Sequence, residues 1–262
     1  MEPIYITSRN NPLVISLAGL SDKKERDRTG LYIVEGFKSC EQACGLGQGE
    51  YVLLREDRTG DSAYADLVSR CGGKLVVLST AAYQKITQDR TPDGILFVLR
   101  AESAKLPADM TGERICILDG IQDPGNVGTI LRSAAALGVD RVILHNCADV
   151  HHPKVLRATM GAYFKISISL CTDLLELIVQ LRKAGRRVLA AALSSGGLVL
   201  GRDPLYPTDC LIFGNEGHGI ADTIIRVCDT TVKIPMTDKA ESLNAAAAAA
   251  VLLWEQSTLE KE

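Results

Sequence analysis

The second half of the chain alternates short apolar runs with longer segments whose apolar residues recur every three or four positions. The apolar runs read RICIL, RVILH, FKISIS, RVLAAAL, DCLIF and TTVKIP. Strands that alternate with amphipathic helices predict an α/β domain. Because these runs are almost uniformly apolar, they predict a parallel sheet that is covered by helices on both faces.

The first half shows the same alternation on a smaller scale. A helix is expected over NPLVISLAGLSDKK, then the run LYIVEG, a short helix through Gly45, the run YVLL, a helix near Tyr64–Arg70, and the runs KLVVLS and GILFVL. The segment Ala101–Glu113 is polar, contains proline and glycine and lacks an apolar period, which is typical of a linker. We therefore expect two domains, a smaller α/β domain over residues 1–105 and a larger one over 112–262.

Composition sets the frame for both domains. The chain has 262 residues, of which 46% are hydrophobic, enough for packed cores. The sequence contains no uncharged apolar run of about 18 residues, and the first ten residues lack a signal-peptide pattern, so we expect a cytoplasmic protein with no membrane segment. The eight cysteines form no CxxC pair and several lie in apolar runs, which favours reduced thiols in the core.

The charge of the chain limits how it can bind nucleic acid. A formal net charge of −3 argues against wholesale coating of RNA or DNA, so any RNA contact must be local. Two basic clusters could provide one, although a solvated surface explains each equally well. They are Lys23, Lys24, Arg26 and Arg28, and Arg182, Lys183, Arg186 and Arg187.

Three segments of the second half place polar side chains on turns marked by glycine or proline. They read LDGIQDPGNVGTILRSAAALG from residue 118, LIFGNEGHGI from residue 211, and IPMTDKAESLNA from residue 234. Each adjoins a predicted strand or helix, and binding sites are commonly built on such turns.

In the first segment, Pro124 and Gly125 precede Asn126, whose side chain is expected to cap the following helix. The apolar stripe of this helix consists of Val127, Ile130, Leu131, Ala134 and Ala135. Arg132 lies off that stripe. It is therefore either an ordinary exposed arginine or a group that faces a cleft.

The second and third segments leave similar alternatives. Glu216 lies among glycines that permit close backbone approach, and it is either a solvated turn carboxylate or a group that orients a substrate or an arginine. Ser242 and Asn244 lie at a helix start, where cap residues occur in any protein, although the amides of a helix N-terminus also bind carboxylates and phosphates. The alanine-rich helix that follows would permit close packing at a subunit interface.

Other ligand-binding patterns fit less well. The glycines after RICIL do not form G-x-G-x-x-G, and no Gly-Lys-Ser/Thr follows. We therefore expect neither a classical dinucleotide-binding loop nor a Walker loop. His145, Cys147, His151 and His152 lie within eight residues of one another, but their spacing fits no standard zinc pattern. We expect no metal site.

Taken together, the three segments resemble the motifs of the SpoU/TrmH family of RNA ribose 2′-O-methyltransferases, in residue type, order and spacing. The run KVLRATMGA resembles a further family motif, with Thr159 where the family usually has serine. SRNNPLV, DKKERDRTG, YIVEGFKSCEQA and TPDGILFVL resemble the family's N-terminal substrate-binding module, an α/β domain similar to certain ribosomal proteins. The resemblance spans nearly the whole chain.

This resemblance implies a SPOUT-type catalytic domain with a deep trefoil knot, an obligate homodimer, S-adenosyl-L-methionine as cofactor, and RNA as substrate, with ribosomal RNA favoured over transfer RNA. The residues that match the family's catalytic positions are Arg132, Asn126, Glu216, Ser242 and Asn244. The residues that match its cofactor contacts are Gly214, Ile234, Met236 and Leu243, with Ala192 or Leu193 nearby. The alternative is a non-catalytic RNA-binding or ribosome-assembly protein of the same fold.

The implied reaction is attack of a ribose 2′-hydroxyl on the methyl group of the cofactor, which needs in-line positioning and no metal. Arg132 is the family's catalytic candidate. A guanidinium is effectively always protonated in proteins, so we expect Arg132 to position the RNA rather than to act as a base.

Overall fold

The computed structural model describes residues 2–44, 49–102, 104–194, 196–239 and 241–257. The chain folds into two compact units. Unit 1 comprises Met1–Ser103 and His151–Phe164, and unit 2 comprises Ala104–Val150 and Lys165–Glu262. This division differs from the sequence-based limits of 1–105 and 112–262 at one segment, because residues 151–164 pack within unit 1.

Unit 1 contains a five-stranded mixed sheet in the order β1-β4-β3-β5-β2. Its strands are β1 (Ile4–Ile6), β2 (Leu31–Glu35), β3 (Gly49–Arg55), β4 (Lys74–Leu78) and β5 (Ile95–Arg100). β1, β4 and β3 are parallel, and β5 runs antiparallel to β3 and β2. β1 was not expected, because its three residues lie in a polar stretch.

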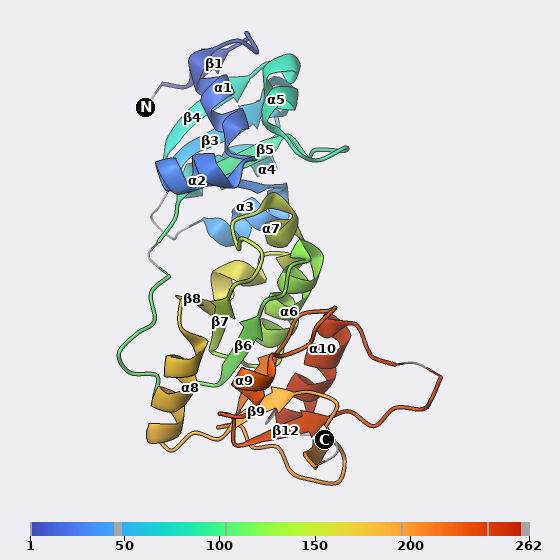
Figure 1. The fold of residues 1–262 in the computed structure, drawn as a ribbon. Coiled ribbons are helices and arrows are strands. Elements are labelled where there is room, and N and C mark those ends of the chain that lie inside the picture. Colours follow the sequence, from blue (N-terminus) through green and yellow to red (C-terminus); the bar gives the residue numbers. More distant parts are fainter. Residues whose placement is uncertain (1, 45–48, 103, 195, 240, 258–262) are drawn as a thin grey trace. The chain divides into compact units, whose positions relative to one another are not determined.

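Helices cover both faces of this sheet (Figure 1). The helices of unit 1 are α1 (Pro12–Gly19), α2 (Lys23–Thr29), α3 (Phe37–Ala43), α4 (Ser62–Arg70), α5 (Thr80–Ile86) and α7 (Pro153–Thr159). α1 and α5 share one hydrophobic core with the sheet, and α3, α4 and α7 share the other. The helix expected over NPLVISLAGLSDKK is two helices, because Asp22 caps α2 by accepting a hydrogen bond from Lys24 N at 2.9 Å. The expected end of α3 at Gly45 lies outside the described residues.

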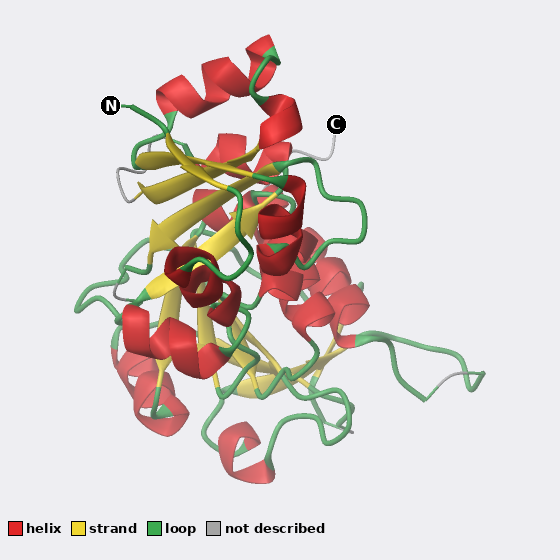
Figure 2. Cartoon of the chain, turned by 90° about the horizontal axis from the view of Figure 1, so that it is seen from above, coloured by secondary structure: helices red, strands yellow, loops and turns green. Residues whose placement is uncertain are grey.

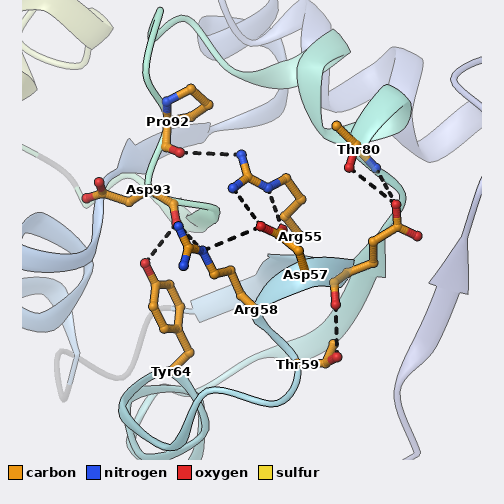
Figure 3. Close-up of polar contacts among 9 residues, drawn as sticks. Arg55, Asp57, Arg58, Thr59, Tyr64, Thr80, Pro92 and Asp93 are labelled. Atoms are coloured by element: carbon orange, nitrogen blue, oxygen red, sulfur yellow. Dashed lines mark hydrogen bonds and ion pairs between the residues drawn. The ribbon is translucent and has the colours of Figure 1, made fainter.

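A polar network fixes the turn that leads into β5 (Figure 3). Arg55, at the end of β3, donates to the Pro92 carbonyl at 3.4 Å. The Asp93 carbonyl accepts hydrogen bonds from Arg58 Nε at 3.0 Å and from the Tyr64 hydroxyl at 2.8 Å. The carbonyls of Pro92 and Asp93 are thus satisfied by side chains, whereas the Gly94 carbonyl accepts from Arg55 N of β3.

The cysteines depart from expectation at one pair. Cys44 and Cys71 form a disulfide within unit 1, so the prediction that all eight cysteines are reduced thiols is wrong for these two. Their Cα atoms, at the ends of α3 and α4, lie 4.8 Å apart, within the range that a disulfide requires. The other six cysteines are free, and all except Cys147 are buried.

Unit 2 contains a seven-stranded sheet in the order β10-β12-β9-β11-β6-β7-β8. Its strands are β6 (Ile115–Asp119), β7 (Arg141–His145), β8 (Ser167–Cys171), β9 (Val188–Ala191), β10 (Leu198–Val199), β11 (Cys210–Phe213) and β12 (Thr230–Lys233). Every neighbouring pair is parallel, which confirms the prediction from the apolar runs. The two-residue β10 was not expected.

The helices of unit 2 are α6 (Pro124–Ala136), α8 (Leu174–Lys183), α9 (Asp222–Ile225) and α10 (Ala245–Gln256). Ile115 and Ile117 of β6 pack with α8 and α9 on one face of the sheet. α6 and α10 pack against each other and lie on the other face (Figure 1). Figure 2 shows the chain with helices, strands and loops in separate colours. None of the helices in the described part of the chain is long and apolar enough to cross a membrane.

The strand order reverses its direction at the centre of this sheet. From β6 the chain proceeds outward through β7 and β8, whereas the later strands β9, β11 and β12 lie on the other side of β6. Such a reversal separates the loops that leave the carboxyl ends of neighbouring strands, and ligands of open α/β sheets bind there. In unit 2 the reversal lies between β6 and β11.

Candidate active site

The loop after β6 leads into α6 through a cap that differs from the expected one. Asp123 is the cap residue, and its side chain accepts a hydrogen bond from Asn126 N at 2.9 Å. Pro124 occupies the first turn, where its missing N–H costs nothing. The prediction that Asn126 caps α6 is therefore wrong, and its side chain makes other contacts.

Asn126 joins the three polar segments. Its Nδ2 donates to Glu216 Oε1 at 2.8 Å, and its Oδ1 accepts from Asn244 Nδ2 at 3.1 Å. Asn244 also caps α10, because its Oδ1 accepts from the backbone N–H groups of Ala246 and Ala247. In Asn126 and in Asn244, the amide oxygen and the amide nitrogen both have hydrogen-bond partners, which fixes the orientation of each amide. Glu216, Asn126 and Asn244 thus form a continuous chain of hydrogen bonds.

Glu216 is held as a carboxylate. Burial by itself would raise the pKa of Glu216, but hydrogen bonds from Asn126 and from the backbone N–H groups of Glu216, Gln122 and Asp123 outweigh it, so its pKa lies below the ordinary 4.5. At neutral pH this group is therefore an ionised hydrogen-bond acceptor that ties the β6–α6 loop to the turn after β11.

That turn is organised by Asn215, which the sequence analysis did not single out. The backbone of Asn215 pairs with Gly219 in both directions, at 3.1 and 2.9 Å. Its Oδ1 accepts from the N–H groups of Gly217 and His218, and its Nδ2 donates to the Gly120 carbonyl at 2.7 Å. An asparagine before a glycine-rich turn is a recognisable signal for such local bonding.

A pocket with a volume of about 600 Å³ lies beside the chain of hydrogen bonds. This size suits a small-molecule ligand. The pocket is formed by the carboxyl ends of β9, β11 and β12 and the start of α10, and Glu216, Ser242 and Asn244 contribute to its wall. All residues predicted to contact a cofactor line it, namely Ala192, Leu193, Gly214, Ile234, Met236 and Leu243.

Gly214 makes the wall of this pocket possible. A Cβ atom at Gly214 would lie 2.5 Å from the carbonyl carbon of Gly219, which is closer than real Cβ atoms approach backbone. A side chain there would force the turn after β11 outward. The glycine therefore allows the two ends of the turn to lie against each other.

Two predicted site residues lie outside the pocket wall, namely Asn126, which belongs to the network beside the pocket, and Arg132. Arg132 lies exposed on α6, away from the buried face that includes Val127, Ile130 and Leu131. It forms no hydrogen bond or ion pair with any described residue, so its guanidinium is available to a substrate.

The histidines do not assemble into the alternative metal site. His145 contacts Asp119 in unit 2, whereas His151 stacks on Tyr32 and His152 caps α7 in unit 1. Within the described ranges, no group of three or more histidine, cysteine or acidic residues is placed to hold a metal ion.

Most side chains of the two basic clusters have protein partners. Lys23 pairs with Asp27, Arg28 pairs with Glu25, and Arg26 donates to the carbonyls of Leu20 and Ser21. In the second cluster, Arg182 pairs with Asp229, Arg187 pairs with Asp209, and Arg186 donates to the carbonyls of Thr208, Met110 and Glu113. These contacts favour the structural interpretation of both clusters.

A parallel sheet with a polar network and a ligand pocket at its carboxyl edge defines a ligand-binding α/β enzyme domain. Residues 113–254 match the model of the SpoU rRNA Methylase family, and residues 11–96 match the MRM3-like substrate binding domain. The chain belongs to the SpoU rRNA methylase family.

Relatives resemble the chain along almost its whole length. The chain is 32% identical to the 23S rRNA (guanosine(2553)-2′-O)-methyltransferase RlmP of Bacillus subtilis, over 95% of this chain and 97% of the relative. It is 28% identical to a 23S rRNA (uridine(2479)-2′-O)-methyltransferase of Streptomyces viridochromogenes, over 95% and 90%. The crystal structure of an AdoMet-bound rRNA methyltransferase from Sinorhizobium meliloti superimposes with a TM-score of 0.82 at 28% identity, covering 96% of both chains.

Proposed function

We propose that this protein methylates a ribose 2′-hydroxyl of ribosomal RNA with S-adenosyl-L-methionine as methyl donor. The observation that carries the proposal is the chain of hydrogen bonds Glu216–Asn126–Asn244, which joins the three family motifs beside the pocket. Relatives that align over nearly the whole chain are named as rRNA 2′-O-methyltransferases, which supports catalysis over a non-catalytic role.

The pocket has the features that the cofactor requires. Gly214 leaves room for close approach to the backbone, and Leu193, Ile234 and Leu243 supply apolar surface for an adenosine ring. When bound, S-adenosyl-L-methionine supplies a methyl group that its sulfonium makes electrophilic. Transfer of this methyl group needs no metal, so we expect methylation to continue in the presence of a chelator.

The surrounding residues would fix the RNA for in-line attack. The Glu216 carboxylate stays ionised and holds the Asn126 amide in one orientation, while Asn244 holds it from the opposite side. Ser242, exposed in the pocket wall, offers a hydroxyl to the incoming nucleotide. Preorganised polar groups of this kind cost no reorganisation during the reaction.

Arg132 would bind the RNA rather than remove the proton of the ribose 2′-hydroxyl. Its exposed guanidinium suits a phosphate next to the target ribose, because its planar set of donors matches phosphate geometry. Proton loss from the 2′-hydroxyl would then be assisted by that phosphate, by water or by Glu216. Unit 1, which contains the substrate-binding match, would supply further contacts to the RNA.

We also propose that the protein works as a homodimer. Ala247, Val251 and Trp254 are exposed on α10 at positions i, i+4 and i+7, so they form an apolar stripe along one face of the helix. Val251 and Trp254 are 39% and 51% exposed. A second copy would bury this stripe, and Val251→Glu should convert a dimer to a monomer in light scattering.

Alkaline hydrolysis tests the ribose assignment directly. Alkaline cleavage of RNA uses the 2′-hydroxyl as nucleophile, so methylation of that oxygen leaves one phosphodiester bond intact. Incubation of an unmethylated large-subunit ribosomal RNA with the protein and S-adenosyl-L-methionine should produce one gap in the hydrolysis ladder. Incorporation of methyl groups with an unbroken ladder would show that a base is modified instead.

A further inference from the structure

His218 lies in the glycine-rich turn after β11 and lines the same pocket as Glu216 and Ser242. It is exposed, and its ring forms no hydrogen bond, ion pair or ring contact with any described residue. The backbone beneath it is fixed, because the N–H groups of Gly217 and His218 both donate to Asn215 Oδ1, at 2.8 and 3.2 Å. The turn therefore places an imidazole with two unused nitrogens at the pocket.

Both ends of the turn are held as well. The backbones of Asn215 and Gly219 pair in both directions, and Gly219 has a φ of 66°, which favours glycine. Ile220, directly after the turn, is 6% exposed and packs in the core with residues of α8 and α9. His218 therefore keeps its place beside the pocket, while no contact with a described residue restrains its ring.

The proposed methyl transfer releases a proton. The ribose 2′-oxygen forms a bond to the methyl carbon, the bond between that carbon and sulfur breaks, and its electron pair stays on sulfur as a neutral thioether. The product ether is neutral too, so the 2′-hydroxyl proton must pass to an acceptor. A positioned general base typically contributes about 10²- to 10⁴-fold to the rate of such a step.

The other ionisable groups among the described residues of the pocket wall are poorer proton acceptors. The pKa of Glu216 lies below the ordinary 4.5, because several hydrogen bonds favour its carboxylate. Lys233 Nζ donates to the Ser194 carbonyl at 3.4 Å, and an ammonium group has no acceptor site. Glu241 is an exposed carboxylic side chain, and such groups ordinarily titrate about two pH units below an imidazole. Proton transfer is most efficient to a group that titrates near the working pH, which favours the imidazole.

We propose that His218 is the general base of the methyl transfer. A nitrogen of the neutral ring accepts the proton of the ribose 2′-hydroxyl as the oxygen attacks, and the imidazolium then releases the proton to water. Arg132 holds the neighbouring phosphate, because a guanidinium has no acceptor site. This inference rests on the proposed function and names the proton acceptor of the same site, since water and a phosphodiester are weaker bases than an imidazole.

Single-turnover methylation of an unmethylated large-subunit ribosomal RNA transcript tests this role, because it separates the chemical step from product release. At saturating RNA, His218→Ala and His218→Gln should each lower the rate by about 100-fold or more. Glutamine still forms hydrogen bonds but accepts no proton at neutral pH, so a loss shared by both variants requires a base. Melting temperature and the affinity for S-adenosyl-L-methionine should stay unchanged.

Added imidazole distinguishes a proton acceptor from a structural group. His218→Ala leaves space at the pocket for a free imidazole molecule, which can take up the proton in place of the ring. The rate of this variant should rise in proportion to the concentration of neutral imidazole, and imidazolium should have no effect. Arg132→Ala is the matched control, since it is expected to be slow but keeps His218, and imidazole should not restore it.

The outcomes separate this inference from the proposed function. If the wild-type protein forms ribose methyl groups and both His218 variants keep its single-turnover rate, His218 is not the base and the proposed function stands. The inference also fails if His218→Gln is as fast as the wild type, or if imidazole does not accelerate His218→Ala. A wild-type protein that forms no ribose methyl group overturns the proposed function itself.

Discussion

At the scale of single residues, the site depends on the charge state of Glu216. Burial opposes its ionisation, and four hydrogen bonds that favour the carboxylate prevail. The bonds from Gln122, Asp123 and Asn126 also hold the β6–α6 loop and the start of α6 against the turn after β11. The folded protein therefore binds a proton at Glu216 less readily than the unfolded chain does. Folding and protonation of this group are therefore linked.

This linkage predicts a pH-dependent contribution to stability. Because the folded pKa of Glu216 lies below the ordinary 4.5, its contribution is complete above about pH 4.5 and is lost as the pH falls through the folded value. The difference in melting temperature between the wild type and Glu216→Gln should be largest near pH 7 and shrink below pH 4.5. Asp238→Asn, at an exposed position of the same unit, serves as a control. A difference that is constant with pH would contradict the linkage.

Arg132 carries the second prediction at this scale. Its side chain is exposed and has no partner in the described structure, so Arg132→Ala should leave the melting temperature and cofactor affinity unchanged. Turnover on RNA should fall by roughly 100-fold or more, the scale of a positioned catalytic group. Arg202→Ala, another exposed arginine of unit 2, should retain activity. A large loss of stability in Arg132→Ala would instead assign the residue to the fold.

At the scale of elements, the two ends of the turn after β11 meet at Gly214. Gly214→Ala would place a Cβ atom against the Gly219 backbone, and the turn would have to move away from the pocket. Affinity for S-adenosyl-L-methionine should fall by about 10-fold or more in calorimetry, corresponding to about 1.4 kcal/mol. Gly196→Ala, whose new Cβ would meet no atom within 4 Å, is the control. Equal affinities in both variants would exclude this role of the glycine.

The elements also show what periodicity can predict. β6, β7 and β11 are buried on both faces, so their apolar runs stand out in the sequence and predict a parallel sheet. The sequence alone could not predict which residue caps α6, because Asp123 and Asn126 are both good cap residues and only the backbone conformation decides between them. The role of Asn215 depends on Gly120, which lies 95 residues away in the chain.

At the scale of the whole molecule, the chain returns to unit 1 after β7. A boundary drawn at the polar linker assumes that each domain is continuous, and no periodicity indicates that residues 151–164 pack elsewhere. Leu156 of α7 is 5% exposed and belongs to the core of unit 1, together with Tyr32 and Phe97. The trefoil knot implied by the family resemblance is tested by none of these contacts and stays a prediction.

This arrangement predicts which unit a core mutation weakens. Leu156→Ala should destabilise unit 1 by about 2–5 kcal/mol, the usual cost of such a truncation, although Leu156 lies within the sequence limits of the second domain. Hydrogen exchange should show lost protection in β2 and β5 and retained protection in β6 and β7. Leu177→Ala, a truncation of similar burial in α8, should produce the reverse pattern. If Leu156→Ala instead lowers protection in β6 and β7 alone, α7 belongs energetically to unit 2.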